Sequence, residues 1–146
     1  MIKFELKQAE KEDFKEIAKI YAEEFSKEPY NEPWTKEKAI YKIDIYSRYC
    51  DIFKIIIENK IIGFIIFNPN YWCPGEIVFC EEIAIKQEFQ NKGIGKDTFR
   101  RLFNNYKEKG YKKAMGIANR KGRALNFYRK LGVRESEENV IIEKEL

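Results

Sequence analysis

Hydrophobic and polar residues follow two different periods along this chain, and the periods predict its first elements. Residues 2–7 alternate apolar and polar side chains, which is typical of a half-buried strand. Residues 11–26 place apolar side chains three and four positions apart, which predicts an amphipathic helix. The segment Pro29–Trp34 breaks this pattern, and Thr35 is suited to begin a second helix as its N-cap.

The middle of the chain is rich in β-branched residues. Residues 52–57 and 61–67 form two such runs with a short polar turn between them, so an antiparallel hairpin is expected. A loop with Pro, Gly and Asn follows, and residues 77–85 then predict a further strand. These three strands are the expected centre of one sheet.

The last third alternates helical and extended patterns. After Gly95 the period is helical until Gly110 stops it. The remaining expected elements are a strand at 112–118, a helix at 123–131, a terminal strand at 139–146 and a short extra strand near Val133. There is no internal repeat or linker-like tract, so residues 1–146 are expected to form one α/β (α+β) domain.

Composition narrows the chemistry. With 44% hydrophobic residues in 146, the chain can bury one continuous core. No apolar run approaches the roughly 18 residues that span a bilayer, and the N-terminus lacks the apolar stretch of a signal peptide, so a cytoplasmic protein is expected. Three cysteines and no histidine offer no common zinc set, so no metal is expected. Proton transfer must then use carboxylates, tyrosines, thiols or water.

Charge is distributed unevenly although the net charge is only +4. Residues 86–134 hold fifteen Lys and Arg against three acids, whereas residues 1–85 and the final twelve residues are each net acidic. This asymmetry suits a polyanionic ligand on one half and a cationic ligand on the other. A solvated basic helical surface, or a face that meets RNA or a ribosome, would give the same asymmetry.

A glycine motif joins the strand at 77–85 to the next helix. Gly93 and Gly95 remove side chains where the backbone turns, exposing N–H groups at the positive end of the helix. Such an arrangement can cradle an anion, and Lys92 and Lys96 add positive charge. The spacing fits neither a dinucleotide fingerprint nor a P-loop. By itself the motif could also be a simple tight turn.

Two segments carry a family resemblance. Gln90-x-x-Gly93-x-Gly95 resembles the [RQ]-x-x-G-x-[GA] signature of the GNAT superfamily of N-acetyltransferases, and ALNFYRKLG at 124–132 resembles its second motif. The resemblance implies a GNAT fold: a mixed, mostly antiparallel sheet of six to seven strands with about four helices. It also implies direct transfer of an acetyl group from acetyl-CoA, without a metal, to a primary amine. A homodimer is a further expectation.

The same resemblance implies where the cosubstrate lies. Backbone N–H groups of residues 90–96 would hold the pyrophosphate, and the main chain of residues 83–85 would pair with pantetheine. The implied cofactor-binding residues are Ile83, Ala84, Ile85, Gln90, Asn91, Lys92, Gly93, Ile94, Gly95 and Lys96. The family usually has asparagine seven residues before the motif tyrosine, where Lys121 stands here. Either the loop is two residues longer and Asn119 contacts pantetheine, or that contact is lost.

The implied catalytic residues are Glu81, Glu82 and Tyr128. Tyr128 would protonate the leaving thiolate, although a tyrosine on a short helix can also be a packing residue. The acceptor ammonium must lose a proton to Glu81, Glu82 or water. Strand alternation puts Glu81 on the side of Ile83 and Glu82 on the other side, unless a bulge intervenes.

Recognition of the acceptor is expected from aromatic and acidic residues in two loops. The candidates are Tyr30, Glu32, Trp34, Tyr71 and Trp72. Together they could bind a cationic amine by charge and cation–π contact, or they could pack on the sheet or at a dimer contact. Two rival functions remain open: a noncatalytic acyl-CoA-binding sensor and an RNA- or ribosome-associated module. The acceptor itself stays undetermined.

Overall fold

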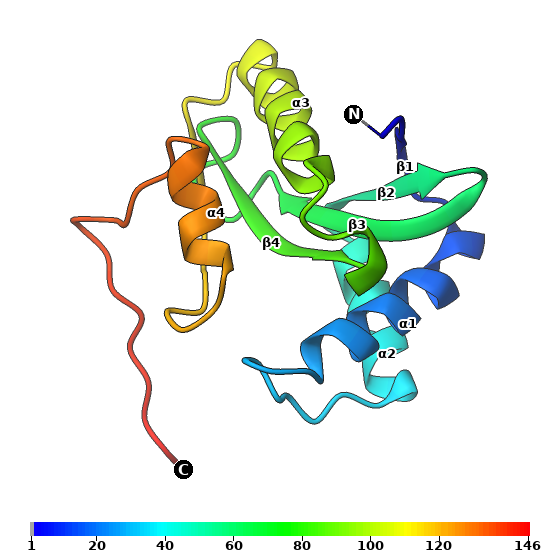
Figure 1. Cartoon of the computed structure of the whole chain (residues 1–146). Helices are drawn as coiled ribbons and strands as arrows, with labels where there is room; N and C mark the ends of the chain where they lie inside the picture. The colour runs from blue at the N-terminus through cyan, green and yellow to red at the C-terminus, as the bar shows by residue number, and fades with distance from the viewer. Residues whose placement is uncertain (1) are drawn as a thin grey trace.

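The computed structural model describes residues 2–146, which form a five-stranded sheet with helices on both faces (Figure 1). Within these residues the strands are β1 (Glu5–Gln8), β2 (Asp51–Ile57), β3 (Lys60–Asn68), β4 (Ile77–Ile85) and β5 (Lys113–Gly116). The α-helices are α1 (Phe14–Phe25), α2 (Lys36–Ser47), α3 (Ile94–Glu108) and α4 (Ala124–Lys130). Two short 3-10 helices, η1 (Lys11–Asp13) and η2 (Gln87–Phe89), precede α1 and α3.

The sheet is mixed and mostly antiparallel, as expected. Its strands lie in chain order, β1-β2-β3-β4-β5, with antiparallel neighbours up to β4 and a parallel pair at β4–β5. Helices α1 and α2 cover one face, and α3 and α4 cover the other (Figure 1). This arrangement leaves β5 at the edge and β3 in the middle.

Strand β3 separates two hydrophobic layers. Phe64 and Ile66 pack against α1 and α2, whereas Ile65 and Phe67 pack against α3. All four side chains are fully buried, because the strand is covered on both faces. Its nearly continuous apolar sequence follows from this position.

The predicted helices are confirmed. The Thr35 side chain caps α2 by accepting a hydrogen bond from the Lys38 N–H at 3.2 Å. Gly110 follows α3 with a φ of +97°, a backbone conformation that glycine adopts without strain. None of the helices within residues 2–146 is long and apolar enough to cross a membrane.

The number of strands is a correction, because residues 2–146 form five strands rather than six or seven. Neither the strand predicted at 139–146 nor the one near Val133 forms. A strand needs a partner for its backbone groups, and the tail runs away from the sheet instead of pairing with β5 (Figure 1). Its apolar side chains, such as Val140 and Ile142, are therefore exposed.

Candidate active site

A β-bulge on β4 sets the geometry of the two candidate carboxylates. Ile66 of β3 pairs with Glu82, but the next residue, Phe67, pairs with Cys80, so Glu81 has no partner. Such an extra residue interrupts the usual alternation of side chains. Both carboxylates consequently reach the face covered by α1 and α2.

Hydrogen bonds define this shared face. Glu82 Oε1 accepts from Tyr21 of α1, and Glu81 Oε1 accepts from Asn68 Nδ2 at 3.1 Å. Asn68 lies two residues after Ile66 on β3 and therefore on the same face of the sheet. Regular alternation would have put Glu81 on the side of Ile83, but Ile83 packs on the α3 face, and the bulge that the sequence analysis left open is present. The bulge is the physical reason.

Glu82 is the carboxylate whose chemistry is most changed by its surroundings. Its Oε1 accepts hydrogen bonds from the hydroxyls of Tyr21 at 2.9 Å and Tyr46 at 3.2 Å. Burial raises the pKa of Glu82 to about 7, although both hydroxyls act to lower it, and the charge of Glu32 raises it further. A carboxyl group with this pKa exchanges a proton readily at neutral pH.

Tyr128 of α4 packs on the α3 side of the sheet, within electrostatic range of Glu82. Its ring lies edge-on to Phe99 of α3, with the ring centres 5.4 Å apart. Burial raises the pKa of Tyr128 above its usual range, and the nearby Cys80, Tyr30 and Glu82 raise it further. The phenol therefore keeps its proton at neutral pH and can act as a donor.

Cys80 lies beside these groups as a neutral thiol. Burial raises its pKa, and the charges of Glu82 and Glu81 add to that effect. Since the thiolate is the nucleophilic form, this environment does not favour covalent catalysis by Cys80.

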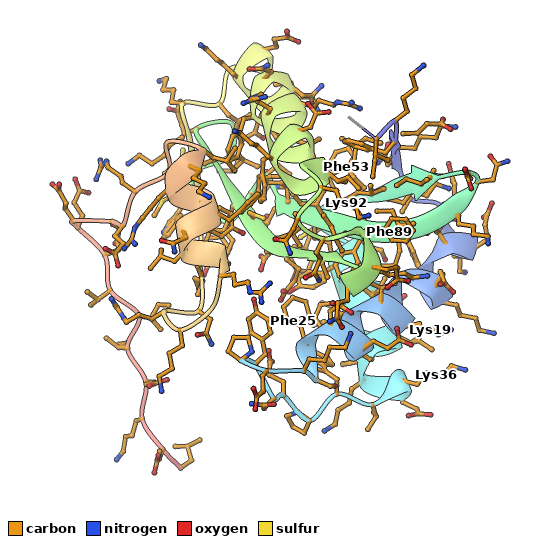
Figure 2. All side chains as sticks on the ribbon, viewed as in Figure 1. Lys19, Phe25, Lys36, Phe53, Phe89 and Lys92 are labelled. Atoms are coloured by element: carbon orange, nitrogen blue, oxygen red, sulfur yellow. The ribbon has the colours of Figure 1, made fainter. Side chains whose placement is uncertain are left out.

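The first turn of α3 offers backbone N–H groups to an anion. Gly93 is its N-cap with a φ of +82°, and the first bond of the helix runs from Asp97 N to Gly93 O at 3.1 Å. The N–H groups before Asp97 have no acceptor within the helix. A Cβ placed on Gly93 would meet nothing within 4 Å, so this side of the turn is open. Lys92 and Lys96 are exposed, and Figure 2 shows Lys92 beside the start of α3.

The side chain of Gln90 braces this loop. Its Nε2 donates to the Ile85 carbonyl at 2.7 Å and to Glu24 Oε1 of α1 at 3.0 Å. One amide group thus connects the end of β4, the loop and α1. The Gln90 side chain therefore positions the loop, and the main-chain N–H groups of the loop remain free for other contacts.

The strands β4 and β5 pair over only part of β4. The pairs run from Ile77↔Lys113 to Cys80↔Gly116, and among residues 2–146 no strand pairs with residues 81–85 on that side. The main chain of the predicted pantetheine-binding residues is therefore at an open edge. Asn119 lies beyond this edge, where its Oδ1 accepts from Lys121 N at 2.8 Å and shapes the turn before α4.

Three of the five predicted acceptor residues gather beside Glu82. Trp34 lies edge-on to Tyr21 with ring centres 4.5 Å apart, and its Nε1 donates to Glu32 Oε2 at 3.3 Å. Tyr30 packs edge-on against Phe25 at 5.0 Å, at the end of α1, where Figure 2 labels Phe25. These residues cover the acidic side of the site.

The other two predicted acceptor residues form a separate group. Tyr71 stacks on Phe79 of β4 with ring centres 4.1 Å apart, and Trp72 lies edge-on to the same ring at 6.0 Å. Both side chains remain more than two-fifths exposed. They lie over the strand segment that leads to the bulge.

The sequence analysis did not identify the residues whose hydrogen bonds position the candidate catalytic and loop residues. Tyr21 and Tyr46 occupy apolar positions of predicted helices and look like ordinary core aromatics, yet their hydroxyls bind Glu82. Asn68 and Glu24 carried no signal, because each acts through a contact distant in sequence. The one available hint was a phenol placed on a buried helix face, since a buried hydroxyl needs a partner.

The fold agrees with several solved structures. A structure described as a possible acetyltransferase from Clostridium difficile 630 matches with a TM-score of 0.82 and 16% identity, covering 98% of each chain. An aminoglycoside N-acetyltransferase in complex with CoA matches with a TM-score of 0.76 and 14% identity, covering 99% of this chain and 96% of the other. A ribosomal-protein-alanine N-acetyltransferase from Brucella melitensis biovar Abortus 2308 matches with a TM-score of 0.74 and 15% identity, covering 97% of this chain and 100% of the other. At these identities the likeness shows the fold.

The sequence itself supplies the family. No curated protein matches it significantly. The model of the acetyltransferase (GNAT) family, however, matches residues 14–133, a stretch that contains the bulged strand, the glycine turn before α3, and α4. The chain therefore belongs to the GNAT family of acetyltransferases.

Proposed function

We propose that this protein transfers the acetyl group of acetyl-CoA directly to a primary amine of a cationic acceptor. The observation that carries the proposal is a pair of groups with different proton affinities, Glu82 and Tyr128, which lie close enough for the charge of Glu82 to raise the pKa of Tyr128. Glu82 has a pKa of about 7, and Tyr128 keeps its proton at neutral pH. Two groups with such different proton affinities suit a base and an acid in one reaction.

The residues that would hold acetyl-CoA fit an anionic, extended ligand. The N–H groups at the start of α3 and the exposed Lys92 and Lys96 suit the pyrophosphate. The open edge of residues 81–85 suits the pantetheine arm. When bound, acetyl-CoA supplies an activated acetyl thioester; the protein positions it and moves protons.

One carboxylate oxygen of Glu82, the proposed base, accepts hydrogen bonds within the protein, and the other oxygen is free to accept a proton. Both tyrosine hydroxyls donate to Oε1 of Glu82, whereas Oε2 accepts no hydrogen bond from residues 2–146. An acceptor ammonium can therefore give its proton to Oε2 while Oε1 fixes the carboxylate. The neutral amine that results is the nucleophile.

The acid acts at the other end of the transfer. Tyr128 holds its phenolic proton at neutral pH and can donate it to the departing thiolate of CoA as negative charge develops on the sulfur. Cys80 stays a neutral thiol, which supports direct transfer without a covalent enzyme intermediate.

The acceptor is proposed to be cationic because its side of the site is acidic and aromatic. Glu32 lies close enough to Glu82 to raise its pKa, and Tyr30 and Trp34 flank it. A positively charged amine gains from both kinds of side chain. Similar folds include enzymes described as acting on aminoglycosides and on a ribosomal-protein alanine, which are amine acceptors.

The proposal is tested by turnover on a panel of amines. The purified chain is incubated with acetyl-CoA and polyamines, aminoglycosides, amino acids or N-terminal peptides, and release of the CoA thiol is followed. We expect release above background with at least one cationic amine. A protein that binds acetyl-CoA in calorimetry but turns over no amine would instead be an acyl-CoA sensor.

Replacing Tyr128 by Phe tests the acid. We expect kcat to fall by about 10²-fold while the KM for acetyl-CoA changes little, because the ring packing stays and only the proton donor is lost. Tyr41→Phe is the control, since Tyr41 is exposed on α2. An unchanged kcat in Tyr128→Phe would show that the tyrosine is a packing residue.

Replacing Tyr21 by Phe tests how Glu82 is tuned. The Tyr21 hydroxyl lowers the pKa of Glu82, so its removal should raise that pKa and move the acidic limb of the kcat/KM profile to higher pH. Tyr46→Phe should move the limb in the same direction. A limb that stays in place in both variants would mean that another group titrates in the profile.

A further inference from the structure

Lys42 of α2 places a positive charge beside the acidic side of the site. It lies four residues before Tyr46, so the two side chains share one face of the helix. The Lys42 Nζ lies over the Tyr46 ring, 4.7 Å from the ring centre. The lysine is half-buried, and no carboxylate among residues 2–146 forms an ion pair with it. An aromatic ring rather than an acid therefore holds this ammonium.

A short chain of contacts joins Lys42 to the proposed base. The ring under the ammonium belongs to Tyr46, whose hydroxyl donates to Glu82 Oε1 at 3.2 Å. The charge of Lys42 acts to lower the pKa of Glu82 and of Cys50, against the larger effect of burial. Because Tyr46 is buried, its ring fixes where the ammonium lies relative to the carboxylate.

The other groups that contact Glu82 or are coupled to it by charge, within residues 2–146, are neutral or acidic. Glu32 raises the pKa of Glu82 by its charge. The remaining titratable neighbours, which belong to α1, the loop after it, α2, β4 and α4, are Tyr21, Tyr30, Tyr46, Cys80, Glu81 and Tyr128. Strand β3 contributes apolar and amide side chains to this face. Lys42 therefore offsets part of the cost of an ionised Glu82.

We propose that Lys42 is a positioning residue for acetyl transfer, whose ammonium, held over the Tyr46 ring, favours the ionised Glu82 carboxylate that takes the acceptor's proton. This inference rests on the proposed function, in which Glu82 is the base. It has a second consequence, because the same positive charge repels a cationic acceptor. Lys42 thus extends proton transfer to lower pH and weakens acceptor binding.

A direct titration of Glu82 tests the effect on the base without any turnover. The NMR signal of its side-chain carboxyl carbon is followed against pH in ¹³C-labelled protein, and Glu82→Gln assigns the signal. Lys42→Met keeps an unbranched side chain and removes the charge. We expect it to move the midpoint of the titration to higher pH by about 0.5 to 1, because a nearby opposite charge favours the ionised form.

Two further variants show that the charge at position 42 is the cause. Lys42→Arg should restore the wild-type midpoint, since a guanidinium is charged and also stacks on an aromatic face. Lys36→Met removes a charge from an exposed position of the same helix and should leave the midpoint unchanged. A midpoint that stays in place in Lys42→Met would overturn the proposal.

Kinetics with a cationic amine test the second consequence. Below about pH 7, kcat/KM of Lys42→Met should fall about three- to ten-fold relative to the wild type, because fewer Glu82 carboxylates are ionised. Well above that pH, Glu82 is ionised in both proteins, and the KM for the amine should be lower in the variant because a like charge is gone. The two pH profiles should therefore cross. An equal loss at every pH would show that Lys42 only supports the packing of α2.

The two measurements separate failure of this inference from failure of the proposed function. Turnover of an amine together with an unmoved Glu82 midpoint in Lys42→Met would overturn the role of Lys42 and leave the proposed function in place. A moved midpoint in a protein that turns over no amine would overturn the proposed function, and with it the part of Lys42 in the reaction.

Discussion

We expect Glu82→Gln to lower kcat/KM at pH 8 by about 10²- to 10⁴-fold, the usual contribution of a general base. Glutamine keeps the size of the side chain and an oxygen that can accept from Tyr21 and Tyr46, but it cannot take a proton. The measurement is the rate of thiol release with saturating acetyl-CoA. Glu37→Gln, an exposed position on α2, is the control and should have wild-type rates.

Glu81→Gln identifies which carboxylate is the base. Because the bulge brings both side chains to one face of the sheet, either carboxylate could take the proton. The losses of activity in Glu81→Gln and Glu82→Gln can therefore be compared directly. A larger loss in Glu81→Gln than in Glu82→Gln would assign the role to Glu81. Similar small losses in both would favour water.

The thermal stability of Glu82→Gln, compared with that of the wild type, checks that the variant is folded. Its dependence on pH checks that the ionised Glu82 carboxylate destabilises the folded protein. The pKa of Glu82 is about 7 in the folded protein, whereas an unperturbed glutamate has a pKa of 4.5. Below pH 4.5 the group is protonated in both states and costs nothing. Between pH 4.5 and 7 the unfolded state ionises first, so the wild type loses stability as pH rises. The Tm of the variant should therefore exceed that of the wild type increasingly over this range and by a constant amount above pH 7.

We expect Gly93→Asp to weaken CoA binding by about 10²- to 10³-fold. In the proposed site a carboxylate at this position would lie beside the diphosphate, and like charges a few ångströms apart near a protein surface cost about 4 kcal/mol. That energy corresponds to nearly 10³-fold in affinity. Isothermal titration calorimetry with CoA measures the change.

Gly110→Asp is a closely matched control at the other end of α3. Both glycines have positive φ, +82° and +97°, and a Cβ on either would meet nothing within 4 Å. The backbone strain and the added charge are therefore equal. The helix dipole favours an acid at the N-terminus and disfavours one at the C-terminus, so Gly93→Asp should be the more stable variant. Equal CoA affinity in the two variants would show that the backbone N–H groups at the start of α3 do not bind the diphosphate.

Local patterns were enough to predict most elements. The helix beginning at Thr35, the hairpin of β2 and β3, and α3 between its two glycines depend on caps, turns and periodicity within the segment itself. The bulge was different, because nothing in EEIAI indicates that Glu81 lacks a partner on β3. Its cause is the register between two strands, which a single segment does not contain.

The sequence was enough to predict the motifs of the candidate site. It was not enough to predict the residues that position those motifs. Gly93 and Tyr128 belong to recognisable patterns, so their positions could be inferred from one sequence. The contact of Tyr21 with Glu82 joins residues 61 positions apart, and only the packing of α1 on β4 creates it. The tail shows the converse: residues 139–146 have a strand pattern, but a strand forms only where a partner edge is available.

The two hydrogen bonds of the Gln90 side chain limit how the loop at residues 90–96 can be moved into another protein. Its single amide nitrogen serves both the Ile85 carbonyl and Glu24, so positions 24 and 90 are chosen together. The signature also admits arginine at position 90, and a guanidinium there would replace the amide–carboxylate hydrogen bond with Glu24 by an ion pair. A chimera that imports the glycine loop into another acetyltransferase scaffold therefore needs an acceptor on the last turn of the first helix. Without one, the graft would carry the correct motif on an untethered segment.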